Sequence, residues 1–251
     1  MKICIDAGHS GSTNPYSVNG KVIGWESEMS WKLHNKLASK LKAAGAEVVF
    51  TRSKFADDPT LEARGKTAKG CGLFLSIHSN AASNSTTDYP LACVSVDGSA
   101  DVLGMKLAHT VASVMQTKQA GRVWKKLIET EAGPIITTET DPKFGKDLGG
   151  RDWFGVIRAA ASVGVPGILL ECSFHTNPAR AQWLTNDSNL DVLATALCDT
   201  IVAHYGIKGN AGVTYTSEEY NALQVKFDAP KTKYDALVED LLALVAKYGG
   251  E

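Results

Sequence analysis

The stretch MKICIDAGHSG, residues 1–11, introduces the pattern that decides the fold of the chain. Its apolar run is typical of a short buried strand, and the strand leads directly to Asp6 and to His9, which lies between Gly8 and Gly11. A lone histidine in a turn usually has no function. A functional interpretation therefore depends on whether other strands deliver polar side chains to the same place.

Strand-like and helix-like segments alternate from this stretch onward. Short apolar runs predict strands at residues 1–7, 47–51, 73–77, 91–96 and 167–171, with a further short strand near residue 123. Helical apolar spacing predicts a helix from Glu26 to a left-handed Gly45, and others at 60–69, 102–115, 156–163, 178–184 and 190–205. Residues 8–24 and most of 117–150 are expected to be loops. The alternation predicts an α/β fold with a mostly parallel twisted sheet and helices on both faces.

The chain is expected to divide into a main domain, residues 1–206, a linker, 207–216, and a short helical C-terminal segment, 217–251. This last segment carries an apolar stripe, formed by Leu237, Leu241, Leu244 and Val245. Such a stripe must pack against something, which favours either assembly into a homo-oligomer or docking on a target.

The composition excludes several classes of protein. Lys and Arg number 26 and Asp and Glu number 27, so no basic excess indicates a nucleic-acid partner. No apolar run approaches the about 18 residues that indicate a membrane span, and residues 1–11 lack the features of a signal peptide. The five cysteines contain no CxxC pair, which favours reduced, buried thiols. Synthesis in a cytoplasm without a signal peptide is therefore expected.

Three predicted strands end in residues that could work on a metal. His9 follows the first strand, His78 lies at the end of the third and Glu171 lies at the end of the last. Because ligands bind at the carboxyl ends of the strands in an open parallel sheet, these side chains are expected to converge. Glu26 begins the first helix, whose N-terminus lies at the same edge. Two imidazoles and one carboxylate suit a catalytic zinc with an open position for water, which predicts three ligands: His9, Glu26 and His78. Glu171 is then the predicted general base.

Each carboxylate also has a simpler interpretation. Glu26 could serve only to complement the helix dipole, and its neighbour Glu28 competes with it as a ligand. Glu171 could pair with Arg151 or Arg158, although a charged residue at the end of a core strand is costly unless it is paired. The motifs GxSxG, GxGxxG, GxxxxGK[ST] and HExxH are absent, so other common catalytic and phosphate-binding sites are poorly supported.

The remaining polar residues are assigned smaller roles. His175 is a less favoured ligand, and Asp6 and Asn80 are candidates for orienting the ligands. Cys172 is expected to point to the face of its strand opposite Glu171, which argues against a nucleophile. Three histidines within helical patterns are interpreted as structural: His34, His109 and His204.

With these residues identified, the chain resembles the zinc-dependent N-acetylmuramoyl-L-alanine amidases of the Amidase_3 family, which occur in phage endolysins and bacterial autolysins. The matching pieces occur in the family's order over most of residues 1–206: ICIDAGHSG, WESEMSWKLHNKL, LEARGKTA, LFLSIHSNA and VPGILLECSFHTNPARAQWL. The resemblance implies that His9, Glu26 and His78 bind zinc and that Glu171 is the catalytic glutamate. It also favours Glu26 over Glu28.

The resemblance further implies a zinc amidase catalytic domain at residues 1–206. Its substrate would be the amide between N-acetylmuramic acid and L-alanine in peptidoglycan, cut by an endolysin or autolysin that acts on the bacterial cell wall after release. A zinc carboxypeptidase acting on the stem peptide and a wall-binding module with an inactive site are the alternatives. The sequence departs from the family at Ser10, where a glycine is common, and residues 117–150 find no clear match.

Overall fold

The computed structural model describes residues 1–128, 133 and 135–208 of the chain. Within these residues, strands and helices alternate in the following order: β1 (Lys2–Ala7), β2 (Pro15–Val18), β3 (Lys21–Trp25), α1 (Glu26–Ala43), β4 (Glu47–Phe50), α2 (Leu61–Lys66), β5 (Leu73–Asn80), β6 (Leu91–Val94), α3 (Asp101–Met115), β7 (Arg122–Lys125), β8 (Ile135–Thr137), α4 (Gly155–Ala161), β9 (Gly167–Phe174), α5 (Pro178–Thr185) and α6 (Asp187–Tyr205).

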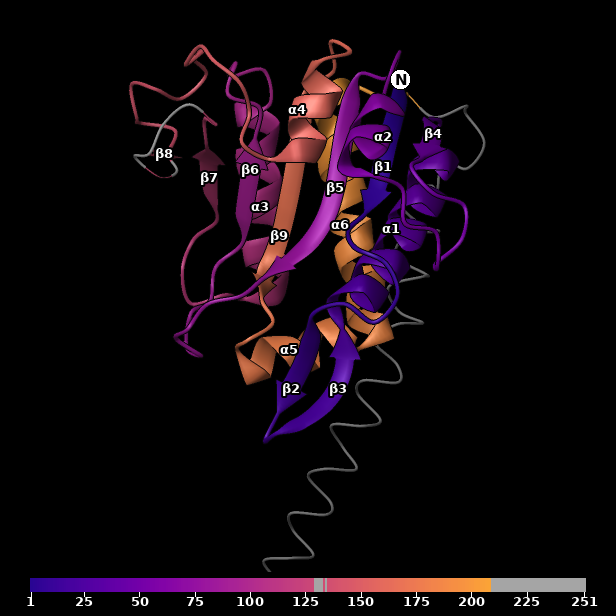
Figure 1. The fold of residues 1–251 in the computed structure, drawn as a ribbon, viewed down its shortest axis with the longest axis vertical. Coiled ribbons are helices and arrows are strands. Elements are labelled where there is room, and N and C mark those ends of the chain that lie inside the picture. Colours follow the sequence, from indigo (N-terminus) through magenta and orange to yellow (C-terminus); the bar gives the residue numbers. More distant parts are fainter. Residues whose placement is uncertain (129–132, 134, 209–251) are drawn as a thin grey trace, which may run out of the picture. The chain divides into compact units, whose positions relative to one another are not determined.

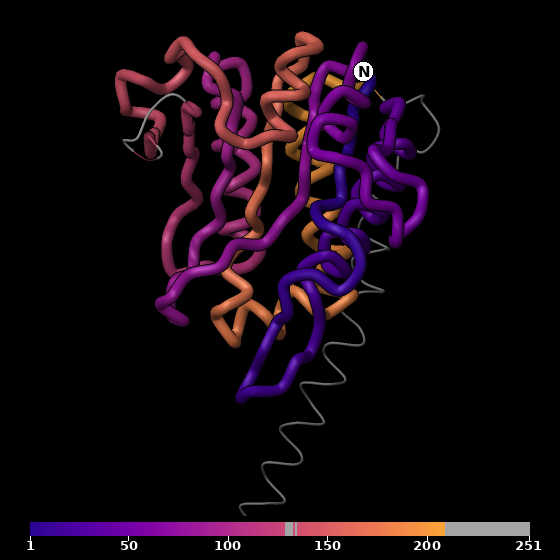
Figure 2. Tube along the Cα trace, in the orientation of Figure 1, coloured from indigo at the N-terminus to yellow at the C-terminus, as the bar shows by residue number. Residues whose placement is uncertain are grey.

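A seven-stranded sheet in the order β4-β1-β5-β9-β6-β7-β8 forms the centre of the fold (Figures 1 and 2). β4, β1, β5 and β9 run parallel to one another. β6 pairs antiparallel with β9 and parallel with β7, and β8 pairs antiparallel with β7. The prediction of a mostly parallel sheet is confirmed, and the antiparallel pairs are confined to one half of it.

Helices cover both faces of the sheet, as expected (Figure 1). Because successive residues of a strand point to opposite faces, Ile3 and Ile5 of β1 pack in a core with α1, α3 and α6. Cys4, between them, packs in a second core with α4 and with the residues that follow α2. The second face is the one that carries the site described below.

The first helix, α1, begins and ends at residues that the sequence predicts. α1 begins at Glu26 after an extended Trp25, and its apolar residues Leu33 and Leu37 are fully buried. The chain leaves the helix through Gly45, which has φ +90°. This is the left-handed position expected from the sequence, where glycine carries no Cβ penalty.

Two predicted loops contain strands. Residues 8–24 were expected to be a loop but include the antiparallel hairpin β2–β3, and β8 lies in the stretch 117–150. The expected short strand near residue 123 is present as β7. The hairpin was missed because its strands are short and largely exposed, so they lack the alternating apolar pattern of a half-buried strand.

β5 and β9 are longer than predicted. β5 continues to Asn80 and β9 to Phe174, because the two strands pair with each other beyond the expected ends. His78 and Glu171, which were expected at the ends of their strands, therefore lie within them and directly opposite each other in the ladder. This pairing places their side chains next to each other on the same face of the sheet.

Three further expectations concern the cysteines, membrane spans and the C-terminal segment. All five cysteines are buried and free, as expected. No helix in the described part of the chain is both long and apolar enough to cross a membrane. The linker at 207–216, the helical segment at 217–251 and its apolar stripe lie outside the described residues, apart from Ile207 and Lys208, so the predicted homo-oligomer stays a prediction.

Candidate metal centre

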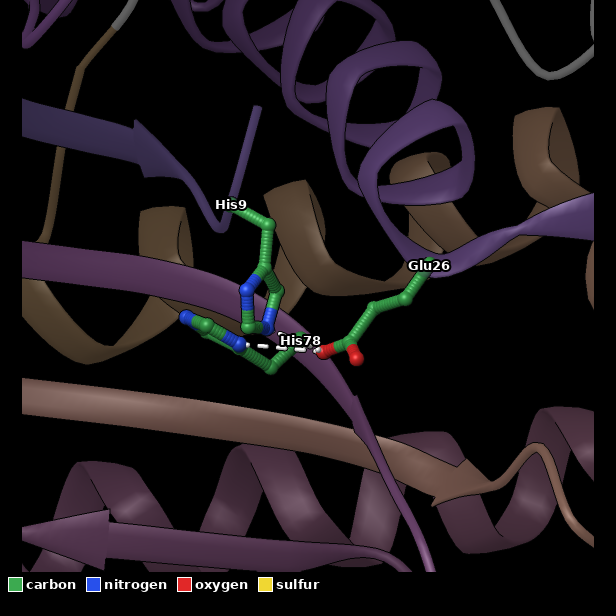
Figure 3. A group of neighbouring side chains, drawn as sticks. All are labelled: His9, Glu26 and His78. Carbon is green, nitrogen blue, oxygen red and sulfur yellow. Dashed lines mark hydrogen bonds and ion pairs between the residues drawn. The ribbon is translucent and has the colours of Figure 1, made fainter. Parts of the chain in front are cut away.

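Three side chains from separate elements meet at the carboxyl ends of β1 and β5 (Figure 3). His9 lies in the loop after β1, Glu26 is the first residue of α1, and His78 lies near the end of β5. One ligand atom from each residue lies within 4.8 Å of those of the other two. The structure thus brings together the three residues that the sequence predicts as ligands. Glu28, the competing carboxylate, is exposed.

Glu26 is the centre of the cluster. Its Oε1 lies 3.0 Å from Nδ1 of His78 and 3.3 Å from Nε2 of His9. The backbone N–H of Ser79 also donates to Oε1 at 2.9 Å, and the side-chain amide of Asn14 donates to Oε2 at 2.7 Å. The carboxylate is only 2% exposed, yet both of its oxygens accept hydrogen bonds. Such a fully bonded carboxylate is fixed in one orientation.

The surroundings keep Glu26 ionised. Burial alone would raise the pKa of its carboxyl group, but hydrogen bonds and charge from His78 and then His9 outweigh burial and hold the pKa well below its ordinary value. An anionic carboxylate beside two imidazoles is a set of nitrogen and oxygen donors that suits a divalent metal ion.

The loop that carries His9 is held from α2. His9 has φ +58°, a left-handed conformation that costs energy for a residue with a Cβ. Arg64, which is 3% exposed, donates to the backbone oxygens of Ala7 at 2.8 Å and of His9 at 3.1 Å. This buried arginine therefore fixes the turn and explains the role of the LEARGKTA segment, which supplies no metal-binding side chain.

His78 is oriented by Asp6 through Ser76. The Ser76 hydroxyl donates to Asp6 Oδ2 at 2.6 Å, and its oxygen lies 3.1 Å from Nε2 of His78. Asp6 is itself held by the hydroxyl of Thr51 and by Arg64. With Nε2 engaged by Ser76, Nδ1 is the nitrogen that faces Glu26. Asp6 thus contacts the cluster indirectly, in keeping with the orienting role considered for it.

Gly8 makes room for the same imidazole. A Cβ built at this position would lie 2.4 Å from Cε1 and 2.5 Å from Nε2 of His78. Gly8 does not have a positive φ, so its absence of a side chain, and not its backbone freedom, is what the site uses. Asn80, in contrast, uses its side-chain oxygen to accept the N–H of Ala81.

Glu171 lies beside this cluster but is not part of it. It pairs with His78 across the β5–β9 ladder, and its Oε2 is buried with no hydrogen-bond partner in the described part of the chain. Burial, and then the charge of Glu26, raise the pKa of Glu171 well above its ordinary value. Cys172 packs in the core on the opposite face, as expected. Few buried carboxylate oxygens lack a partner, although Oδ1 of Asp101 is a second example in the described residues. What distinguishes Glu171 is its place opposite His78 in the ladder.

The sequence matches the sequence model of the N-acetylmuramoyl-L-alanine amidase family, Amidase_3, over residues 3–203. The chain belongs to the Amidase_3 family. All the segments on which the resemblance was based begin and end within this match.

This Amidase_3 chain is similar to named amidases in sequence and in fold. It is 30% identical over 208 residues to the N-acetylmuramoyl-L-alanine amidase LytC of Bacillus subtilis, covering 81% of this chain but only 35% of that protein. Its fold is similar to the catalytic domain of the amidase CwlV of Bacillus (Paenibacillus) polymyxa, with a TM-score of 0.62 at 20% identity, covering 82% of this chain and 99% of that one. An amidase of Clostridium difficile 630 also gives 0.62, at 22% identity and covering 83% and 98%.

This Amidase_3 domain also contains a buried network that sequence reasoning missed. The hydroxyls of Tyr16 and Ser79 are hydrogen-bonded at 2.7 Å, and Ser79 Oγ lies 2.9 Å from Nδ1 of His175. The rings of Tyr16 and His175 stack with centroids 5.1 Å apart. Nδ1 of His175 is 4.0 Å from Oε2 of Glu26, too far for a hydrogen bond, and His175 is not one of the three clustered ligands. Only the unpredicted hairpin brings Tyr16 here, and no local signal in the sequence marks it.

A cavity of about 350 Å³ opens in front of the two histidines of the Amidase_3 site. It is lined by Asp6, His9, Asp58, Pro59, Thr60, Leu61, Arg64, His78 and Val156. A substrate can therefore approach the imidazoles from the face of the sheet that carries α2 and α4.

Proposed function

We propose that the chain is a zinc-dependent N-acetylmuramoyl-L-alanine amidase that hydrolyses the amide bond between N-acetylmuramic acid and L-alanine in bacterial peptidoglycan. The observation that carries the proposal is the convergence of His9, Glu26 and His78 beside Glu171 in a chain of the Amidase_3 family. Among the described residues, Oε2 of Glu171 has no hydrogen-bond partner. The proposed biological role is that of an endolysin or autolysin, which degrades the cell wall and lyses the cell.

The donor set fits a catalytic zinc. Two imidazoles and one carboxylate are three protein ligands of the types that zinc prefers, and they leave a fourth position for water or substrate. The ligand atoms are already close together, and Glu26 and His78 are held by hydrogen bonds from outside the set. A zinc ion bound by these residues would supply Lewis acidity toward the amide carbonyl and toward water.

Glu171 moves the proton in the proposed reaction. Its carboxylate accepts a proton from the attacking water and passes it to the nitrogen of the departing L-alanine. The position of Glu171 next to His78 in the ladder, but outside the ligand cluster, supports a role that differs from that of Glu26. Two carboxylates in one site thus have separate tasks, because one has a full set of hydrogen bonds and the other has a free oxygen.

The test is the chemical product formed from purified peptidoglycan by the full chain, with and without a metal chelator. We expect new N-terminal alanine amines without new reducing sugar ends, their loss on chelation and their recovery when zinc is returned. Glu171→Gln is the matched control, because it keeps the size of the side chain and the three predicted ligands. It should form almost no product.

Other products would replace the proposal. Release of C-terminal D-alanine would identify a carboxypeptidase acting on the stem peptide. Binding to walls with no product of any kind would identify a non-catalytic wall-binding module. Activity that a chelator does not affect would exclude the metal while leaving the amidase reaction itself in place.

A further inference from the structure

A second hollow adjoins the cavity at the histidines. It lies between α2 and α4, has a volume of about 480 Å³, and is lined by Thr60, Leu61, Glu62, Lys66, Gly155, Arg158, Ala159 and Ser162. Thr60 and Leu61 line both hollows. A chain that leaves the metal centre past these two residues therefore enters the α2–α4 groove.

The contact between α2 and α4 beside this groove is built from small residues. A Cβ built at Gly65 of α2 would lie 2.4 Å from the backbone oxygen of Val156 and 2.5 Å from Cβ of Ala159 in α4. The two helices are in backbone contact there, so they cannot move together to close the groove. Gly155 leaves space in a similar way, since its Cβ would lie 3.0 Å from Cδ1 of Leu61.

Arg158 gives the groove an oriented positive charge. Its Nη1 donates to the backbone oxygens of Asp152 at 2.7 Å and of Trp153 at 3.0 Å. Among the described residues no carboxylate pairs with this guanidinium, and its Nη2 makes no hydrogen bond. Arg158 is thus held in place by backbone oxygens and makes no ion pair in the described residues, although its charge also acts on the nearby carboxyl group of Asp152. Arginine in this state suits a carboxylate, which can accept two N–H groups at once.

The other cation of the groove is less available. Lys66 pairs with Glu62 one helical turn away, and both side chains are mostly exposed, at 53% and 71%. An exposed pair of this kind contributes little, but it balances the charge of Lys66. Leu61 adds an apolar surface at the entrance to the groove, where it is 59% exposed.

We propose that the α2–α4 groove binds the peptide side of the substrate and that Arg158 pairs with a carboxylate of that peptide. The inference rests on the proposed amidase function, in which the leaving group is L-alanine at the head of a peptide that carries free carboxylates further along. The apolar Leu61 lies where the first residues of the peptide pass, and Arg158 lies beyond it. The chain would therefore prefer acidic stem peptides over the same peptides with amidated carboxylates.

The test compares two soluble muramoyl-peptide substrates that differ only in having free or amidated stem carboxylates. The zinc-loaded full chain is measured against Arg158→Gln and against Arg122→Gln, whose guanidinium packs on Tyr89 and lines neither hollow. Arg158→Gln should lower kcat/KM for the acidic substrate about tenfold or more, mainly through KM, because a charge-assisted hydrogen bond is lost. The amidated substrate should be cleaved equally by all three proteins.

The amidated substrate also controls for folding. An Arg158→Gln protein that is damaged as a whole would lose activity on both substrates, and an Arg158→Lys variant would then show whether a cation alone restores the preference. Equal rates on both substrates by the wild-type chain, or an unchanged preference in Arg158→Gln, would overturn the proposal for the groove.

A separate binding measurement distinguishes this proposal from the proposed function. NMR titration with a free acidic peptide beginning with L-alanine should shift amide signals of α2 and α4 in the wild-type chain and not in Arg158→Gln. If neither substrate is cleaved, the amidase function fails, and this titration still decides whether the groove binds an acidic peptide. The absence of shifts in the wild-type chain would reject the groove even in an active amidase.

Discussion

The two halves of the sheet use their buried polar side chains in different ways. In the parallel half, formed by β4, β1, β5 and β9, Asp6 and Ser76 lead to an imidazole that faces a cavity. In the other half, Lys125 of β7 and Asp101 of α3 are fully buried and pair at 2.6 Å. Lys125 also donates to the backbone oxygens of Lys143 and Lys146. The first half thus directs polar atoms toward a cavity, and the second uses them to hold its own loops in place.

The largest expected effect is on the rate of hydrolysis, and it comes from substitution of Glu171 in the parallel half. Glu171→Gln should lower the rate of amide hydrolysis by about 10²–10⁴-fold, the usual contribution of general acid–base catalysis. The free energy of unfolding should stay the same or rise, since a buried carboxyl group with no partner becomes a neutral amide. Steady-state kinetics and urea denaturation measure the two quantities. Retention of a tenth of the rate or more would remove Glu171 from the reaction.

In the other half of the sheet, a substitution in the buried ion pair should lower stability and leave activity unchanged. Lys125→Met leaves Asp101 buried without its cation, so the free energy of unfolding should fall by about 3–5 kcal/mol. Activity per folded molecule should be unchanged. In the double variant Lys125→Met, Asp101→Leu, most of the stability should return, because no unpaired charge remains. A double variant as unstable as the single one would show that the loop contacts of Lys125, and not the ion pair, are what matter.

A third test concerns α1, which lies behind the parallel half and carries the buried His34. Its Nδ1 donates to the backbone oxygen of Trp31 at 3.2 Å, and its Nε2 is buried with no partner in the described residues. Burial, assisted by the charge of Arg52, lowers the pKa of His34 from 6.5 to about 4. The unfolded chain therefore binds a proton that the folded chain does not bind.

The consequence is a loss of stability in acid. The contribution of His34 is fully present above pH 6.5 and is lost as the pH falls from 6.5 toward about 4. The loss should reach about 3 kcal/mol at the acidic end. Denaturation at a series of pH values measures it, and His34→Leu should flatten the curve in this window. A variant with the same pH dependence as the wild-type chain would assign the loss to other groups.

The smallest effect should come from the support of His78. Ser76→Ala removes the hydroxyl that joins Nε2 of His78 to Asp6, so zinc should bind about 10–100-fold more weakly. Competition of the metal-free protein with a coloured chelator measures this affinity without any turnover. Ser95→Ala, which removes a buried hydroxyl near the end of β6, is the control and should leave the affinity unchanged. Equal affinities in all three proteins would mean that His78 needs no support from Ser76.

The sequence was sufficient for the parts of the molecule that follow simple periodicities. The apolar runs that became β1, β5 and β9 are buried on both faces, and such strands are recognised from composition alone. The convergence of His9, Glu26 and His78 follows from the parallel direction of these strands, because parallel strands end at one edge. The first helix was predicted from Glu26 to Gly45 because its leucine stripe and its final glycine are both local signals.

The features that the sequence did not predict depend on contacts between residues that are far apart in the chain. The hairpin β2–β3 is held by Tyr16, whose partners Ser79 and His175 lie far along the chain. Its own residues carry no strand pattern that local reasoning can detect. The direction of β6 also has no local signature, since an antiparallel strand and a parallel strand of four buried residues look alike. Asn14, which holds Glu26, was missed for the same reason as Tyr16.

The close contact between Gly8 and His78 means that the residue tolerated at position 8 depends on the residue at position 78. The imidazole of His78, 70 positions further along the chain, occupies the space that a side chain at position 8 would need. The backbone at Gly8 has no positive φ, so its conformation alone does not require glycine. A descendant that exchanged His78 for a small residue would release position 8 as well, and alanine or serine would then be tolerated there. Paired loss of glycine and histidine at these two positions is therefore expected in homologues that lack the proposed metal site and keep the fold.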